Sequence, residues 1–353
     1  MTAYMLPREY RGVVFAIGLF LAVQAGALAL VPAFTASGYQ PVENPQDPTN
    51  SLLYVVAILA MSGVMLAAFR YEFDWAVRLL IVGVSAWLSW YVFAAVAPPL
   101  VAAIPAVGVA VGLLVYPEWY VIDSAGVVMG AGAAGLFGIS FGPLPALVLL
   151  AALAVYDAIS VYGTEHMLSL AEGVMDLNIP VVLVIPLSLS YSLLEESSGT
   201  DGVTSANDQA EPPSDETGES LDAERESLDD TDEPAADGPA ADESATDEPA
   251  TDERDAFFIG LGDAVIPAVL VASAATFSPA APLSVPYLGL NLPALLAATG
   301  TLSGLLLLLR WVMRGRPHAG LPLLNGGAIG GYLLGSVLAG VPLVEAVGLA
   351  SIL

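Results

Sequence analysis

Long apolar stretches, separated by short polar ones, run through most of the chain. An α-helix needs about 20 mainly apolar residues to cross the hydrocarbon core of a bilayer, and it satisfies its backbone hydrogen bonds internally. Stretches close to that length lie at 13–33, 52–69, 76–97, 99–116, 122–141, 144–163, 257–277, 289–311 and 321–342. The pattern predicts an all-α membrane protein, a bundle of nine transmembrane helices whose first helix is retained rather than removed as a signal peptide.

The connection between the sixth and seventh predicted helices has two different compositions. Residues 164–180 are polar enough for the membrane interface, and residues 181–191 are β-branched, too short to span and interrupted by Pro186, so we expect a strand there. Residues 195–255 lack the apolar side chains that a folded core needs, so we expect disorder. The predicted organisation is helices one to six in 1–163, an interfacial segment and short strand in 164–194, a disordered acidic loop in 195–255, and helices seven to nine in 256–353.

Charge is concentrated in that loop. Of the 36 acidic residues, 23 lie between Glu195 and Asp255, and all nine basic residues are arginines. An acidic, lysine-free composition is typical of a halophilic host, because dense carboxylates keep protein surfaces hydrated at high salt. The absence of cysteine excludes disulfides and thiolate catalysis, and two histidines give little material for a metal site. We therefore expect neither a metal nor an organic cofactor.

The arginines predict how the chain is oriented in the membrane. With nine crossings, the arginine-bearing loops all fall on one side, which the positive-inside rule makes cytoplasmic. The N-terminus is then expected in the cytoplasm and the C-terminus outside. The arginines concerned are Arg8, Arg11, Arg70, Arg78, Arg310, Arg314 and Arg316.

Ionisable residues are nearly absent from the predicted helices, and those that occur are mostly near the helix ends. Glu118 and Asp123 flank the loop before the fifth helix and are interpreted as loop charges, whereas Asp157 and Asp263 lie well inside helices six and seven. An acid at membrane depth costs a few kcal/mol, so each is a candidate functional residue. Each lies about six residues from the cytoplasmic end of its helix, or roughly 9 Å deep at about 1.5 Å per residue. The two carboxyls are therefore predicted to meet.

Two carboxyls at one depth allow more than one function. Like charges a few ångströms apart cannot both ionise, so the pair shares a proton. The ionised acid can then activate water while the protonated acid donates to a peptide carbonyl, as in the aspartic-protease dyad. The same pair would equally serve ion binding or proton relay in a transporter, although the internal repeats common in carriers are not visible here. A scaffold without activity would not need two matched acids.

The neighbours of both aspartates favour proteolysis. Tyr156 sets a phenol beside the first acid in a YD sequence, and Gly260, Leu261 and Gly262 precede the second acid in a GLGD sequence. Small residues beside a carboxyl leave room for the backbone of a substrate. The motif GxGD alone is weak, so the third element decides the interpretation.

The last predicted helix supplies that third element. It opens with GLPLLNGG, in which Pro322, Leu323 and Leu324 lie at the same cytoplasmic level as both aspartates. The three motifs together resemble the presenilin and signal-peptide-peptidase family of intramembrane aspartyl proteases, in which a YD helix, a GxGD helix and a later P-A-L helix form the site. The family's middle alanine is Leu323 here. The sequence VYGTEHM after the first acid is similar to archaeal presenilin homologues in particular.

The resemblance implies a function and a set of partners. It implies hydrolysis of peptide bonds in single transmembrane helices, from membrane proteins or signal peptides, within the lipid bilayer and without nucleic acid. It makes Asp157 and Asp263 the catalytic pair, with the GLGD and PLL residues positioning the substrate. The expected orientation fits the presenilin branch, since signal peptide peptidases are inverted. The strand that contains Val181 and Val182 would offer an edge to an unwound substrate, because cleavage needs an extended backbone.

Overall fold

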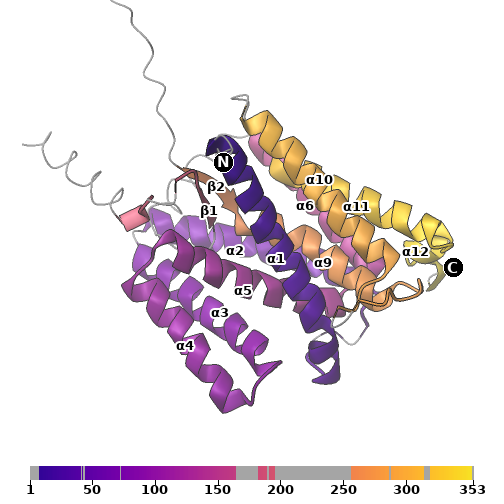
Figure 1. Cartoon of the computed structure of the whole chain (residues 1–353), viewed down its shortest axis with the longest axis horizontal. Coiled ribbons are helices and arrows are strands. Elements are labelled where there is room, and N and C mark those ends of the chain that lie inside the picture. Colours follow the sequence, from indigo (N-terminus) through magenta and orange to yellow (C-terminus); the bar gives the residue numbers. More distant parts are fainter. Residues whose placement is uncertain are drawn as a thin grey trace, which may run out of the picture. The chain divides into compact units, whose positions relative to one another are not determined.

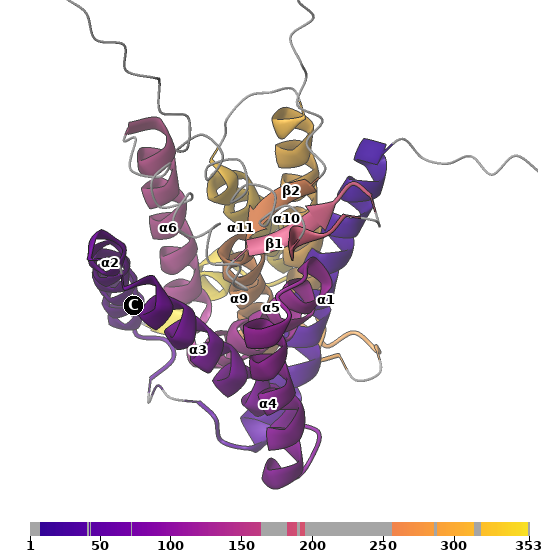
Figure 2. The same cartoon turned by 90° about the vertical axis from the view of Figure 1, so that its left-hand side faces the viewer.

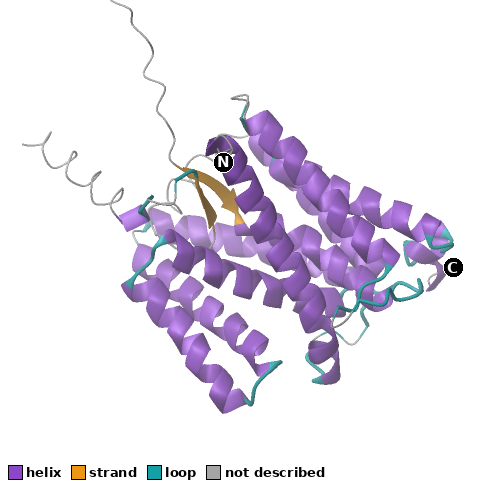
Figure 3. Ribbon diagram, viewed as in Figure 1, coloured by secondary structure: helices purple, strands orange, loops and turns teal. Residues whose placement is uncertain are grey.

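The structure is a computed structural model of the chain. It describes residues 8–40, 42, 44–71, 73–163, 182–188, 191–194, 256–285, 288–313 and 319–351. Helices make up nearly all of this part of the chain, with a single small sheet among them (Figure 3). The predicted acidic loop and Val181 lie outside the described residues.

Each predicted transmembrane segment has a helical counterpart. Six helices precede the long connection: α1 (Arg8–Ala36), α2 (Thr49–Arg70), α3 (Asp74–Ala94), α4 (Pro99–Val115), α5 (Trp119–Ser140) and α6 (Pro143–Gly163). After it come α9 (Leu261–Phe277), α10 (Leu292–Val312), α11 (Gly320–Leu338) and the short α12 (Leu343–Ala346), before a 3₁₀ turn at Leu349–Ser351. Within the described residues, seven of these helices are long and apolar enough to cross a membrane, and α4 and α9 are shorter apolar helices.

The start of α9 differs from the expectation. A helix was predicted from residue 257, but Ala256–Gly260 forms the strand β2, which pairs antiparallel with β1 (Val182–Pro186) in the register Val182 with Gly260 and Pro186 with Ala256. The prediction of a strand within residues 181–191 is confirmed at β1. Hydropathy did not separate the two cases at residues 256–260, because an apolar AFFIG sequence suits a buried strand as well as a membrane helix.

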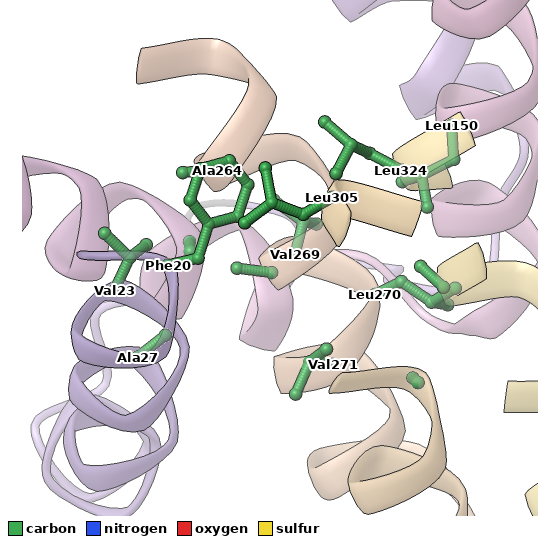
Figure 4. Close-up of a cluster of buried hydrophobic side chains, with 14 of the residues drawn as sticks. Phe20, Val23, Ala27, Leu150, Ala264, Val269, Leu270, Val271, Leu305 and Leu324 are labelled. Carbon is green, nitrogen blue, oxygen red and sulfur yellow. The ribbon is translucent and has the colours of Figure 1, made fainter. Parts of the chain in front are cut away.

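The helix α9 lies at the centre of the bundle. It packs against α1, α5, α6, α10 and α11, and Figures 1 and 2 show it between these helices in both views. Most of its residues from Ala264 to Ala274 are buried, and many are alanine or valine, which lets the surrounding helices approach closely. Its side chains join those of α1, α6, α10 and α11 in the core that Figure 4 shows.

Glycines let α10 and α11 approach each other closely. Gly300 of α10 meets the backbone of Gly327 of α11, and Gly304 meets the carbonyl of Leu323, so closely that a Cβ on either α10 glycine would overlap the partner backbone. Small residues at such positions let helices in lipid pack through their backbones. The first turns of α11 are therefore held directly against α10.

The helix α2 has the opposite character. Most of its apolar side chains are exposed, among them Leu52, Leu53 and Val56 at 59%, 66% and 62%. Its contacts are mainly with α6, at the side of the bundle. An apolar helix exposed to this degree is stable against lipid rather than water, which agrees with a multi-pass membrane protein.

Candidate active site

Asp157 lies on α6, as predicted, six residues before Gly163, the last residue of this helix that the structure describes. Its side chain is 7% exposed, and its Oδ2 accepts a hydrogen bond of 3.0 Å from the backbone N–H of Leu321. A buried carboxylate needs such a donor, because burial without a partner costs several kcal/mol. The bond connects two helices that are far apart in the sequence, α6 and α11.

Asp263 lies in the first turn of α9, as the third residue of the helix. The expectation that it lies six residues inside the helix is wrong, because β2 takes the residues before Leu261. The carboxyl is half-buried and is directed toward the start of α11: a Cβ built on Gly320 would lie 3.3 Å from its Oδ2. Both carboxyls thus lie beside the start of α11, and the local structure around the second differs from the expectation.

The beginning of α11 is the element that both acids share. The helix starts at Gly320, and its first backbone N–H groups have no partner within the helix, as in any α-helix. The side chain of the preceding Ala319 cannot accept a hydrogen bond from them. The N–H of Leu321 donates to Asp157, and Pro322 has no N–H to satisfy. Gly320 of this turn lies beside Asp263. The PLL motif therefore begins between the two carboxyls.

The side chains of the PLL motif have different environments. Pro322 and Leu323 are partly exposed beside the site, whereas Leu324 is fully buried. Leu324 belongs to the same cluster of buried side chains as Leu150 of α6 (Figure 4). Leu324 is thus placed as an anchor of α11 rather than as a surface open to a substrate.

The residues of the GLGD motif also differ in burial. Leu261 is 7% exposed and packs against α5, where a Cβ on Gly126 or Gly130 would lie 3.7 or 3.3 Å from its side chain. Gly260 and Gly262 are exposed, and a Cβ on Gly262 would meet only the end of the Ile266 side chain, at 3.8 Å. Packing within the described residues therefore does not require glycine at position 262.

The remaining predicted site residues lie further from the acids. Tyr156 is 43% exposed, and within the described residues its hydroxyl makes no hydrogen bond to either aspartate. Val182 is paired with Gly260 inside the sheet, and Val181 lies outside the described residues. The described residues also contain no cluster of three or more His, Cys, Asp or Glu side chains able to hold a metal ion.

A cavity of about 190 Å³ opens beside Asp263. Its walls come from α1, both strands, the C-terminal part of α10 and the start of α11. Apart from Asp263, all of these residues are apolar or glycine, and the volume has room for an apolar side chain rather than a single water. The lining residues are Gly12, Val13, Ile185, Phe257, Phe258, Ile259, Gly260, Asp263, Leu308, Leu309, Val312, Met313 and Gly320.

Asn325 is a residue of this region that sequence reasoning missed. It is fully buried on α11, and its Nδ2 donates a hydrogen bond of 2.9 Å to the carbonyl of Leu150 on α6. Leu150 lies about two helical turns before Asp157, so this bond and the Leu321–Asp157 bond fix the same two helices at two levels. A single amide inside an apolar helix was the available signal, because such residues seldom occur in lipid without a partner.

Comparisons with known proteins find similar sequences and structures over most of the chain. A sequence profile described as "Signal-peptide peptidase, presenilin aspartyl protease" matches residues 17–341. A solved structure described as "Structure of a presenilin family intramembrane aspartate protease in C222 space group" is 31% identical, with a TM-score of 0.58, over 92% of this chain and 99% of the other.

A second solved structure, described in the same words but in the P2 space group, is 29% identical, with a TM-score of 0.55, over 92% of this chain and 97% of the other. A search of curated proteins finds no significant match. The profile and both structures extend over nearly the whole chain, on both sides of the acidic connection, and they share its helical fold. The chain belongs to the signal-peptide peptidase and presenilin family of intramembrane aspartyl proteases.

Proposed function

We propose that this protein cleaves peptide bonds of transmembrane helices inside the bilayer, with Asp157 and Asp263 as the acid–base pair. The observation that carries the proposal is the convergence of both carboxyls on the first turn of α11. Two acids held by different helices against a common third element form a site of fixed geometry. Fixed geometry is what an acid–base pair needs to act on one water and one carbonyl.

The proposed chemistry uses one shared proton. The ionised aspartate takes a proton from a water molecule as the water oxygen attacks the carbonyl carbon of the scissile bond, and the protonated aspartate donates its proton to the carbonyl oxygen. The tetrahedral intermediate then breaks its C–N bond while one carboxyl protonates the leaving amine and the other carboxylate accepts the proton of a hydroxyl group of the intermediate. The result is one new carboxyl terminus and one new amino terminus, and the pair returns to its starting protonation. Because the acids are coupled, the proton belongs to the pair rather than to either residue.

The substrate is proposed to reach the acids as an extended strand. The strand β2 lines the cavity and continues directly into the turn that carries Asp263, so a strand added along β2 would bring its carbonyls to the acids. Gly260 and Gly262 leave the approach to Asp263 free of side chains. The apolar cavity would receive a side chain of the substrate next to the scissile bond, which fits the composition of transmembrane helices.

The membrane arrangement is part of the proposal. We infer nine crossings, in which α4 and α9 also span although they are 17 residues each. At 1.5 Å per residue such a helix is about 26 Å long, slightly less than a bilayer core of about 30 Å. The strand β2 directly precedes α9, so its extended residues lengthen the crossing at the N-terminal end of the helix, where Asp263 lies. In the proposed orientation, which the positive-inside rule favours, the N-terminus and the acid pair face the cytoplasm and the C-terminus lies outside.

The test is cleavage of a reporter transmembrane helix in reconstituted vesicles. Asp157→Ala and Asp263→Ala should each remain folded and lose cleavage by at least a thousandfold, because neither acid can act alone. Asp47→Ala is the matched control: Asp47 lies in an exposed loop, where it accepts a hydrogen bond from the N–H of Thr49, and its loss should leave the rate unchanged. Wild-type cleavage by either single dyad variant would refute the assignment. Ion flux through wild-type vesicles without cleavage would instead identify a carrier.

A further inference from the structure

The N-terminal end of α5 holds the strand β1 and the chain that follows it. Oδ1 of Asp123 accepts a hydrogen bond of 2.8 Å from the backbone N–H of Val184, in the middle of β1. Oε2 of Glu118 accepts one of 3.3 Å from the N–H of Leu193, and the indole of Trp119 donates to the Tyr191 carbonyl at 3.0 Å. Figure 2 shows the two strands lying across the ends of α5 and α9.

These contacts correct the interpretation of Glu118 and Asp123 as loop charges. Asp123 lies within α5 and is 3% exposed, and Glu118, next to the helix, is 5% exposed. Among the described residues, Oδ2 of Asp123 is buried without a hydrogen-bond partner. A carboxyl with one satisfied oxygen destabilises an apolar region relative to a well-packed apolar residue. Stability alone therefore does not explain an aspartate at this position, whereas a role for the bond to Val184 does.

The bond fixes which edge of the sheet is free. In an antiparallel pair each N–H points either toward the partner strand or away from it, and that of Val184 points away from β2, toward α5. Asp123 therefore occupies the outer edge of β1 at its centre. Within the described residues the sheet has two strands only, so the outer edge of β2 is the one left for strand addition.

The same bond connects α5 to the catalytic region through a short path. Val184 pairs with Phe258 of β2, and Asp263 follows five residues later along the chain. α5 also contacts the first residue of α9, since the side chain of Leu261 packs over Gly126, one turn after Asp123. One face of α5 thus contacts both the sheet and the first residue of α9. The chain passes from the sheet into α9 at this point, just before Asp263.

We propose that Asp123 is a positioning residue of the protease: by accepting the N–H of Val184 it anchors β1, and through β1 it fixes β2 and Asp263 against the substrate strand. The proposal rests on the function proposed above. It assigns Asp123 no contact with the substrate and no proton transfer. Its effect is on where the substrate lies relative to the acids, and so on both the rate and the position of the cut.

The experiment compares Asp123→Ala, Asp123→Asn and Glu118→Ala in the reporter assay. Asp123→Ala removes the acceptor, and Asp123→Asn keeps an oxygen for Val184. Glu118→Ala removes a second buried carboxyl from the same region, but one that holds the chain after β1. Three quantities are measured: kcat per folded molecule, the cleavage position by mass spectrometry, and hydrogen exchange of the Val184 amide.

For Asp123→Ala we expect fast exchange at Val184, a kcat at least tenfold lower and a shift or spread of the cut by one or more residues, since misplacement by about 1 Å can cost a hundredfold. Asp123→Asn should keep the protected amide, the wild-type cut and a kcat within about threefold. Glu118→Ala should lower thermal stability and keep the cut. A loss of folded protein alone would reduce the signal without moving the cut.

Several outcomes would overturn the proposal. One is a wild-type rate and cut in Asp123→Ala despite an exchanging Val184 amide, and another is an equal shift of the cut in Glu118→Ala. If Asp123→Ala does not fold, Asp123→Asn decides: a moved cut with a protected Val184 amide contradicts the proposal. Wild-type protein and Asp263→Ala are run in parallel, so that absence of cleavage by the wild type counts against the protease function and not against the role of Asp123.

Discussion

The backbone N–H of Leu321 donates to Oδ2 of Asp157 across 3.0 Å, and so joins the PLL motif of α11 to the acid of the YD motif. The contact is made by the main chain, so the identity of the side chain at position 321 does not create it. It sets the orientation of one carboxyl while the residue before it, Gly320, faces the other. The three motifs of the family thus meet in a single helical turn.

Leu321→Pro tests this bond. Proline is tolerated in the first turn of a helix, where it removes an N–H that has no helical partner, so the main change is the loss of the donor to Asp157. A hydrogen bond to a charged group contributes about 1.5–3 kcal/mol, so we expect kcat to fall by about tenfold or more. Leu321→Ala keeps the N–H and should stay within about threefold of the wild type. Equal kinetics for the two variants would show that the bond does not matter for catalysis.

Gly304 should be essential to the position of α11. A methyl group at this residue would overlap the carbonyl of Leu323, and forced overpacking typically costs about 1–3 kcal/mol. Gly304→Ala is therefore expected to lower both the melting temperature in detergent and the cleavage rate. Gly326→Ala, on α11 with nothing within 4 Å of the added Cβ, is the control and should change neither. A melting temperature unchanged in Gly304→Ala would contradict the close packing of the two helices.

The cavity beside Asp263 should determine which side chains are accepted near the scissile bond. Val312→Phe adds volume to its wall, and a pocket of changed size discriminates by about 1–3 kcal/mol. We expect kcat/KM to fall about tenfold for a reporter with phenylalanine at the affected position, and much less for one with alanine. Leu306→Phe, on the same helix but 47% exposed and outside the cavity, is the matched control. Parallel losses for both reporters would exclude the cavity as a specificity pocket.

Asn325 should stabilise the pairing of α6 with α11. Replacing it by leucine removes the bond to the Leu150 carbonyl, which in a membrane protein is expected to cost about 1 kcal/mol. Ser336→Ala offers the comparison, because Ser336 is equally buried on α11 and its hydroxyl donates to the Tyr332 carbonyl of the same helix. Loss of this local bond should cost about 0.5 kcal/mol or less. Denaturation in detergent measures both. Equal stabilities would show that the interhelical bond adds nothing beyond a local one.

Much of this architecture follows from residue patterns. Hydropathy located the helices, because a run of about 20 apolar residues has few alternatives in a lipid environment. The positions of Asp157 and Asp263 as costly charges in such runs singled out the two acids that we propose as the catalytic pair. Asp157 lies within α6, the helix expected to carry it.

Other parts of the structure could not be predicted from the sequence, for physical reasons. The strand β2 depends on pairing with β1, a contact far along the chain that the local AFFIG sequence does not encode. The donor to Asp157 is a main-chain N–H, which every residue except proline carries, so no side chain announces it. Asp123 was misjudged because charged residues near a helix end are usually solvated, and only the path of β1 shows that this one is buried.

Two helices begin at the acid pair, α9 at Leu261 and α11 at Gly320. The first N–H groups of a helix carry a partial positive charge, and a helix that starts within an apolar layer has little water to compensate it. Asp263 lies in the first turn of α9, and Asp157 accepts from the first turn of α11. Each carboxyl therefore lies beside the partly positive start of a helix, and each helix start in turn favours the negative charge of the carboxyl beside it. The protein supplies inside the membrane the polar environment that water would give such groups outside it, before any substrate arrives.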